Sequence, residues 1–455
     1  MKQTTALYSE AARPQFHFTA QKNWLNDPNG LVFFDGEYHL FYQYNPFGSE
    51  WGNMHWGHAV STDLVHWTEL PIALYPDGLG MMYSGSAVVD WSDTTGFQAG
   101  DAPPLVAAYT AAGGDDPGSP GQLYTQCLAF SHDRGRTWEK YAGNPVLPHR
   151  AGQNRDPKVI WDTVHSCWVV CLYLEGNDFA LYTTPDLKQW THLETFALPG
   201  SDECPDFFPL SVEGELGKPL WVFMGANGLY LLGEFDGEKF TVTEGPYRSD
   251  YGANFYAGQT YSDIPAADGR RIQIVWMRGG VYPEMPFNQQ MSFPCVLTLH
   301  RHAEGLRLHR NPIHEIQRQR GAVHRWLNQA VQPGENPLSA ISGELFEIIA
   351  EVADNKGGGA WGLFVGGQEV RYDPSSRMLH CLGCSAPLDA ENGKITLHLL
   401  VDRTSIEVFA NGGLISLSSC FVPVPGKSGL AFFAEDSAAT VISLEIYELH
   451  SAWAV

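Results

Sequence analysis

A turn pattern that ends in tryptophan recurs three times in the first 200 residues of this 455-residue chain. The copies occupy residues 61–67, 131–138 and 184–190, and each has Ser or Thr, then Asp two residues later, then a closing Trp. In such a turn the Asp accepts backbone N–H bonds, and the Trp packs beneath a β-hairpin. The copies begin 70 and 53 residues apart, which favours large β units with variable loops over three unrelated hairpins.

This recurrence predicts an all-β fold built around a β-propeller, whose blades are four-stranded antiparallel sheets. Residues 231–240 have the pattern of a further blade hairpin. Aromatic residues make up 13% of the chain, and there are 47 Gly and 29 Pro. That mixture is typical of short strands, many turns and exposed aromatic surfaces, and not of disorder.

The composition changes near residue 300. Residues 301–320 are rich in Arg and His, and we interpret them as a linker with one short helix. A basic binding patch is the alternative, but Glu304 and Glu315 interrupt it. Short alternating strands follow, which predict a β-sandwich. We therefore expect a catalytic β-propeller over 1–300, a linker over 301–320 and a β-sandwich over 321–455.

The formal net charge of −23 disfavours nucleic acid or an anionic membrane surface as a partner and suits a neutral substrate. The first 25 residues contain no apolar run of signal-peptide length, so we expect a cytoplasmic location. The eight cysteines are scattered. Cys381 and Cys384 form a C-x-x-C without a second pair at zinc spacing, so we expect reduced thiols and no metal.

Three acidic residues stand close to prolines. Asp27 and Asp156 each directly precede a Pro, and Glu203 lies two residues before one. Proline fixes its own φ and favours an extended neighbour, so each acid is expected at a defined strand end. Each acid alone could be a solvated turn residue. The innermost strands of a propeller converge on its axis, however, so acids from three blades can meet there.

Paired carboxylates on either side of a bond are what glycoside hydrolysis requires. Glu203 has acidic neighbours and is followed by two phenylalanines, which predicts a raised pKa and an acid/base role. Asp27, in an Asn-rich turn, is expected to stay ionised and act as the nucleophile. Asp156, beside Arg155, is expected to stay ionised and hold substrate hydroxyls.

Three short motifs carry a family resemblance: residues 24–30 (WLNDPNG), 155–157 (RDP) and 203–205 (ECP). They resemble, in order, the signature motifs of glycoside hydrolase family 32, the invertase, inulinase and levanase family. Residues 402–409 resemble its sandwich signature. The resemblance implies a five-bladed β-propeller followed by a C-terminal β-sandwich. It also implies a retaining mechanism on β-fructofuranosides that needs no cofactor or metal.

By the same resemblance, Asp27 is the nucleophile, Glu203 the acid/base and Asp156 the transition-state stabiliser. It also implies eight sugar-binding residues: Asn26, Gln43, Trp51, Tyr83, Ser84, Arg155, Tyr256 and Trp276. Two positions depart from the family pattern, because Tyr83 stands where Phe is frequent and Asn254 where Asp is common.

Residues 285–294 resemble exo-acting fructanases more than sucrose-6-phosphate hydrolases. We therefore expect release of terminal fructose from sucrose and short fructo-oligosaccharides. The alternatives are a sucrose-6-phosphate hydrolase, a fructosyltransferase and, more distantly, a non-catalytic carbohydrate-binding propeller. Residues 131–138 also resemble a sialidase turn, but the arginine cluster of a sialidase is absent from the sequence. The expected partner is a small sugar or oligosaccharide, and the sandwich is a candidate surface for a homo-oligomer.

Overall fold

The computed structural model describes residues 8–114, 117–355, 357–424, 426 and 429–453. In these ranges the chain is all-β, with 32 strands and one short 3-10 helix, His314–Gln319. No helix among these residues is long and apolar enough to cross a membrane. The expected all-β class is confirmed.

The strands that precede the helix form five sheets in the described part of the chain. The first has the order β19-β1-β2-β3-β4, with β19 (Phe287–Asn288), β1 (Asn23–Phe34), β2 (Glu37–Asn45), β3 (His55–Ser61) and β4 (Thr68–Leu74). The second comprises β5 (Met81–Val89), β6 (Leu105–Ala112), β7 (Thr125–Ser131) and β8 (Glu139–Lys140). The third comprises β9 (Arg155–Asp162), β10 (Cys167–Glu175), β11 (Asp178–Thr184) and β12 (Thr191–Ala197).

The other two sheets complete the N-terminal domain. The fourth comprises β13 (Asp206–Leu210), β14 (Leu220–Met224), β15 (Leu229–Phe235) and β16 (Phe240–Arg248). The fifth comprises β17 (Tyr256–Thr260), β18 (Arg271–Trp276), β20 (Cys295–His302) and β21 (Gly305–Pro312). Consecutive strands pair antiparallel within each sheet, as short strands joined by tight turns must.

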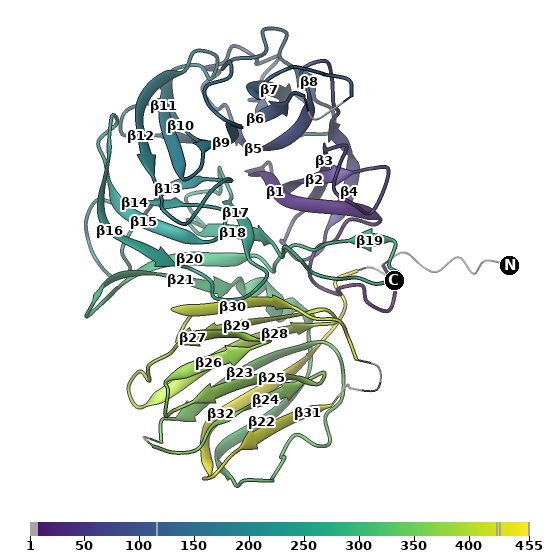
Figure 1. Cartoon of the computed structure of the whole chain (residues 1–455), viewed down its shortest axis with the longest axis vertical. Helices are drawn as coiled ribbons and strands as arrows, with labels where there is room; N and C mark the ends of the chain where they lie inside the picture. The colour runs from purple at the N-terminus through teal and green to yellow at the C-terminus, as the bar shows by residue number, and fades with distance from the viewer. Residues whose placement is uncertain (1–7, 115–116, 356, 425, 427–428, 454–455) are drawn as a thin grey trace, which may run out of the picture.

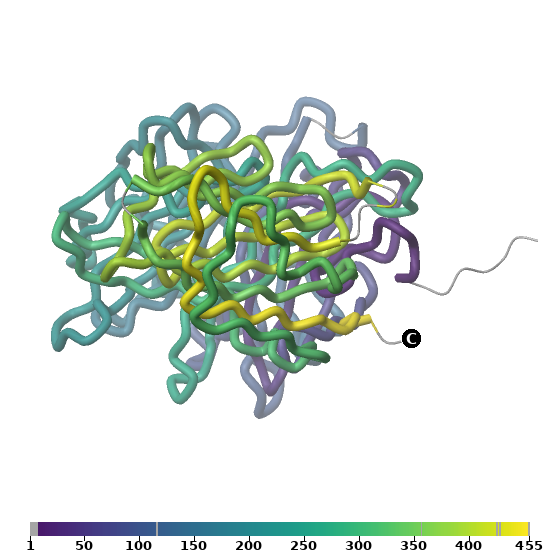
Figure 2. The backbone as a smooth tube through the Cα atoms, turned by 90° about the horizontal axis from the view of Figure 1, so that it is seen from below, coloured from purple at the N-terminus to yellow at the C-terminus, as the bar shows by residue number. Residues whose placement is uncertain are grey.

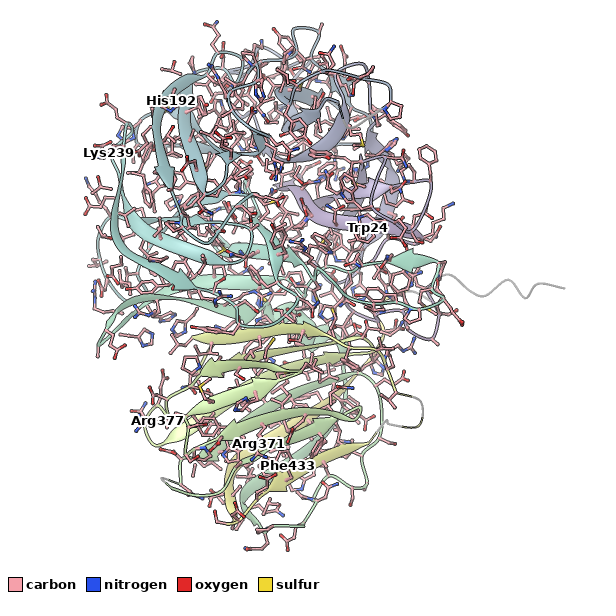
Figure 3. The ribbon with its side chains drawn as sticks, in the orientation of Figure 1. Trp24, His192, Lys239, Arg371, Arg377 and Phe433 are labelled. Atoms are coloured by element: carbon pink, nitrogen blue, oxygen red, sulfur yellow. The ribbon has the colours of Figure 1, made fainter. Side chains whose placement is uncertain are left out.

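The first strand of each sheet faces a common centre (Figure 1). Around this centre β1 contacts β5, β5 contacts β9, β9 contacts β13, β13 contacts β17, and β17 contacts β1. The N-terminal domain is therefore propeller-like. The outer strands lie far from the centre, as His192 on β12 and Lys239 before β16 illustrate at the edge of the domain in Figure 3.

The recurring turns join the third and fourth strands of the first three sheets, as expected from the pattern. In the first turn the Asp63 carboxylate accepts the backbone N–H groups of Val65 and His66 at 3.0 and 2.9 Å. Asp133 and Asp186 accept backbone N–H groups in the same way. Residues 231–240 form the β15–β16 hairpin, so this prediction of a blade hairpin is confirmed.

Most of the residues predicted as a linker lie in the fifth sheet of the propeller-like domain, and the boundary predicted at residue 300 falls within β20. β20 and β21 pair along their whole length from Cys295↔Pro312 to His302↔Gly305. Every second residue along these strands is a buried leucine: Leu297, Leu299, Leu306 and Leu308. This alternation is the strand pattern, but the Arg and His residues between the leucines made the segment look like a polar linker. The expected short helix is present at His314–Gln319.

The C-terminal domain is a β-sandwich of two sheets around an apolar core. One sheet has the order β22 (Arg320–Val331), β32 (Ala439–Leu449), β23 (Phe346–Ala353), β28 (Lys394–Asp402), β29 (Ser405–Ala410) and β30 (Ile415–Cys420). The other has the order β27 (Cys384–Pro387), β26 (Met378–Cys381), β25 (Gln368–Asp373), β24 (Trp361–Val365) and β31 (Leu430–Ala434). Figure 2 shows these green and yellow strands in front of the N-terminal domain.

A chain of buried charges joins the two domains. His17 lies between Asp402 and Glu407, with its ring nitrogens 2.8 Å from each carboxylate. Arg310 on β21 continues the chain, 3.2 Å from Glu407 and 3.4 Å from Asp250. Burial by itself would lower the pKa of His17, but its hydrogen bonds to the two carboxylates raise it to about 9. His17 is therefore protonated and paired at neutral pH.

We expect His17→Phe to destabilise the protein by roughly 3–5 kcal/mol, because it leaves buried Asp402 without its cation and Glu407 with Arg310 alone. The folded-state pKa of His17, about 9, lies above the ordinary histidine value of 6.5. The wild type should therefore hold this contribution below about pH 6.5 and lose it as the pH rises towards 9. Chemical denaturation at pH 6 and pH 9 measures both effects.

His66→Gln is the matched control, because the His66 side chain is half exposed beside Asp63. It should cost less than about 1 kcal/mol, as surface ion pairs do. Equal pH slopes for the wild type and His17→Phe would contradict the assignment of this pH dependence to His17.

Candidate active site

The inner strands bring the three predicted acids together at one end of the propeller-like domain. Asp27 lies on β1, Asp156 on β9, and Glu203 three residues before β13. All three line one pocket of about 760 Å³. Asp27 and Asp156 are 129 residues apart in sequence, and Asp156 and Glu203 are 47 apart. The ring of first strands brings all three acids into the same pocket.

The pocket also contains every predicted sugar-binding residue: Asn26, Gln43, Trp51, Tyr83, Ser84, Arg155, Tyr256 and Trp276. Six further residues that were not among the predicted site residues complete its wall: Trp24, Tyr124, Gln153, Arg278, Gly279 and Gln289. Trp24 opens the first motif, and Gln289 lies in the segment 285–294 that the sequence had already singled out. The other four stand outside the family-like motifs, and no local pattern distinguishes them.

The Asp27 carboxylate is held from several sides. Oδ2 accepts a hydrogen bond from the Ser84 hydroxyl at 2.6 Å, and Oδ1 accepts one from the Asn26 amide at 3.2 Å. The Cys204 thiol lies 3.5 Å from Oδ2. The Asn26 side chain is itself fixed, because its oxygen accepts the Trp24 indole N–H at 2.8 Å. This network gives the carboxylate one orientation towards the pocket.

Asp156 is buried and sits in an unusual backbone conformation, with φ at 64°. Its N–H donates to the Thr110 hydroxyl at 2.9 Å, and its Oδ2 accepts the Cys204 N–H at 3.0 Å. Burial raises the pKa of Asp156 to about 7, Arg155 opposes this rise, and the charges of Glu203 and Asp27 add to it.

This upward shift runs against the expectation that Asp156 stays ionised. Its pKa of about 7 means that a substantial fraction of the carboxyl is protonated at neutral pH. The reason is geometric: the Arg155 Nε stands 3.7 Å from the carboxylate, too far for a strong charge-assisted hydrogen bond. Loss of water on burial outweighs this single cation.

Glu203 reaches the pocket from a strained turn, in which Glu203 and Cys204 have φ values of 50° and 40°. Its Oε1 accepts the Tyr256 hydroxyl at 3.0 Å, and its Oε2 lies 3.4 Å from Arg155. Burial raises the pKa of Glu203, Arg155 lowers it, and the charges of Asp27 and Asp202 raise it. The net shift is upward, as the sequence predicted for this acid.

Aromatic rings form two walls of the pocket. Trp276 packs edge-on against both Trp24 and Tyr256, with ring centroids 6.1 Å apart in each pair. On the other side, Trp51 packs against Tyr83 at 6.2 Å, and its side chain is 52% exposed. Trp24, labelled in Figure 3, lies on β1, where this strand pairs with β19. Such walls suit the apolar faces of a sugar, with polar groups left to bind its hydroxyls.

Asn254, which stands where the family often has Asp, serves the loop behind the pocket. Its amide nitrogen donates to the Arg278 carbonyl at 2.6 Å, and its oxygen accepts the Cys420 N–H at 2.7 Å. A carboxylate could not make the first of these bonds. This amide therefore ties a pocket residue to β30 of the sandwich.

Asp156, Glu203 and Cys204 place one potential metal-ligand atom each within 4.8 Å of one another. Two features of the cluster disfavour a bound cation. The Arg155 guanidinium already stands beside both carboxylates. Burial and the neighbouring acids also raise the pKa of the Cys204 thiol well above its usual range, which opposes the thiolate that a metal requires.

Comparisons with known proteins agree with the geometry. Residues 17–312 match the model of the glycosyl hydrolases family 32 N-terminal domain, and residues 315–448 match that of the family 32 C terminal. A levanase of Bacillus subtilis (strain 168) is 40% identical to this chain over 99% of it, which corresponds to 72% of the levanase.

Two solved structures have the same fold. An exo-inulinase from Aspergillus awamori aligns with a TM-score of 0.88 and 29% identity, over 98% of this chain and all of that one. A fructofuranosidase from Schwanniomyces occidentalis in complex with fructosylnystose aligns with a TM-score of 0.86 and 26% identity, over 98% and 99% of the two chains. On the match of both family models, this chain belongs to glycoside hydrolase family 32.

Proposed function

We propose that this protein is a β-fructofuranosidase that removes terminal non-reducing fructose from fructans, fructo-oligosaccharides and sucrose. The observation that carries the proposal is the convergence of Asp27, Asp156 and Glu203 in one aromatic-walled pocket. The similarity to a levanase, an exo-inulinase and a fructofuranosidase supports this substrate class.

The proposed mechanism is a double displacement with retention. The Asp27 carboxylate, oriented by Ser84 and Asn26, attacks the anomeric C2. At the same time Glu203, whose pKa is raised, gives its proton to the leaving oxygen. Glu203 then takes a proton from water, which attacks C2, breaks the bond to Asp27 and releases fructose.

Asp156 takes the role of holding the fructosyl hydroxyls as positive charge develops on the ring. Its partial protonation lets it donate as well as accept hydrogen bonds, which suits hydroxyls that do both. Its contact with the backbone N–H of Cys204 couples its position to that of the acid/base next to it.

A phosphorylated sugar is a less suitable substrate. Arg155 and Arg278 are the cationic residues of the pocket wall among the described residues. Arg155 stands beside two carboxylates, and Arg278 lies 4.4 Å above the Tyr256 ring. Neither forms the basic cluster that a phosphate group favours. Transfer of fructose to another sugar shares the same first step with hydrolysis, and product analysis separates the two.

We further propose that the five N-terminal sheets are five blades of a closed propeller. The ring of contacts between β1, β5, β9, β13 and β17 supports this, as does the parallel pairing of β19 with β1. We place the domain boundary at residues 313–319, between the last strand of the fifth sheet and the first of the sandwich. Cytoplasmic location and self-association through the sandwich stay predictions.

The function is tested by incubating the protein with sucrose, sucrose-6-phosphate, inulin, levan and short fructo-oligosaccharides, and resolving the products over time. We expect free fructose as the first product from the fructans and sucrose, because hydrolysis begins at the terminal unit. Internal fragments without early fructose would contradict the exo mode. Activity on sucrose-6-phosphate alone would contradict the substrate class.

Asp27→Asn should lower fructose release from sucrose by at least about 10³-fold, because the amide cannot attack C2. Glu203→Ala should cause a similar loss, and azide should restore turnover with an activated fructoside, since azide needs no general base. Asp202→Asn is the matched control. It changes the acid directly before the motif at 203–205, which accepts the Tyr256 hydroxyl but does not line the pocket. Full activity of Asp27→Asn would reject the proposed nucleophile.

The alkaline limb of the kcat/KM profile should follow the pKa of Glu203, which must be protonated in the free enzyme. The Asp202 charge raises this pKa, so Asp202→Asn should move the limb to lower pH. The Tyr256 hydrogen bond lowers it, so Tyr256→Phe should move the limb to higher pH. Shifts of roughly 0.5 pH unit are expected for changes of this size. Shifts in the same direction would exclude Glu203 as the titrating acid.

A further inference from the structure

A second cavity lies at the opposite ends of the inner strands, and we call it the distal cavity. Its volume is about 390 Å³. β5 reaches the active-site pocket at Ser84 and the distal cavity at Val89, and β9 reaches them at Asp156 and Ile160. At about 3.3 Å per strand residue, the two cavities are separated by roughly 13–17 Å of the domain. The distal cavity is therefore a separate site on the other face.

Trp91 forms the exposed rim of the distal cavity. Its side chain is 62% exposed, which is unusual for so large an apolar ring. The ring is nevertheless held in place, because its indole N–H donates to the Asp263 carboxylate at 2.9 Å and it packs against Phe34 at 5.9 Å. A ring that is both exposed and fixed is a preformed contact surface.

A second tryptophan, Trp161, lies in the same wall. It packs edge-on against Trp168, with ring centroids 4.9 Å apart, and the Trp168 indole donates to the Thr94 hydroxyl at 2.8 Å. Trp91 and Trp161 therefore offer two aromatic surfaces to one cavity, both supported by neighbouring groups.

Polar groups stand between these rings. The Asp263 carboxylate accepts the Val89 N–H at 2.9 Å as well as the Trp91 indole, so each oxygen keeps a further acceptor site. Arg271 uses one N–H on the Tyr261 carbonyl at 3.1 Å and packs on the Phe208 ring at 5.1 Å. Its other N–H groups make no hydrogen bond within the described residues, so the wall supplies both donors and acceptors.

A neighbouring cavity of about 450 Å³ shares the lining residues Pro209 and Arg271 with the distal cavity. Each of the two volumes falls within the range of about 300–1,000 Å³ that is typical of ligand pockets.

We propose that the distal cavity is a non-catalytic binding site for a neutral sugar chain, and that its ligand is the fructan itself. Fixed aromatic rings receive the C–H faces of sugar units, and Asp263 and Arg271 bind their hydroxyls. An anionic ligand is disfavoured by Asp263 in the wall and by the net charge of −23. The choice of fructan rests on the proposed function. A bound polymer would raise the concentration of chain ends near the active-site pocket.

The test uses Asp27→Asn, so that the polymer is not consumed, and compares it with Asp27→Asn/Trp91→Ala in native gels that contain levan, inulin or dextran. We expect levan or inulin to retard the parent and the affinity to fall about tenfold without Trp91, as when a central aromatic contact is truncated. Trp91→Phe should keep part of the retention. Phe364→Ala, an exposed ring on β24 of the sandwich, is the matched control and should change nothing.

A second measurement uses the intact nucleophile. Trp91→Ala should hydrolyse sucrose at the wild-type rate but release fructose from dilute levan several-fold more slowly. Equal retention with and without Trp91, no retention of the parent, or equal retention by dextran and levan would overturn the proposal. Failure of the proposed function is a different result, because fructose release from sucrose reports the active-site pocket alone.

Discussion

The chain of buried charges between the domains determines where the first acid of the pocket lies. Asp402, the last residue of β28, accepts the backbone N–H groups of Gln15, Phe16 and His17. These three residues lie more than 380 positions earlier in the sequence. These residues stand just before β1, which carries Asp27. Because an unpaired charge in this interior would be costly, the sandwich must dock for the N-terminal segment to be fixed. The sandwich thus acts as a structural part of the catalytic domain.

The chemistry of the pocket depends on electrostatic repulsion between carboxylates that are buried away from water. Asp27 and Asp156 share the Cys204 thiol as a neighbour at 3.5 Å, and Glu203 precedes that cysteine in a strained turn. Burial and mutual repulsion raise the pKa values of Asp156 and Glu203, and Arg155 alone cannot cancel this effect. An upward shift of the Glu203 pKa favours the protonated form that a general acid requires.

Local patterns predicted a large part of this architecture. The Asp-containing turns predicted blade hairpins, because the hydrogen bonds that define each turn all lie within eight residues. Proline-adjacent acids predicted the three carboxylates of the pocket. The boundary predicted at residue 300 falls within β20, because the Arg and His residues of β20 and β21 obscured a strand period that the buried leucines carry. The prediction that Asp156 stays ionised did not include its burial, which raises its pKa, and Arg155 at 3.7 Å only partly opposes that rise.

The sequence by itself determined which chemical groups are present: three carboxyls at stiffened strand ends, amides and aromatic rings near them, and an all-β chain to carry them. Only the tertiary structure decided how deeply each carboxyl is buried. It also decided which residues outside the motifs, such as Tyr124 and Arg278, complete the pocket. It also decided that Trp91, Trp161 and Asp263 share a cavity on the opposite face. Distances and burial arise from the closure of strands far apart in sequence, and no local pattern encodes them.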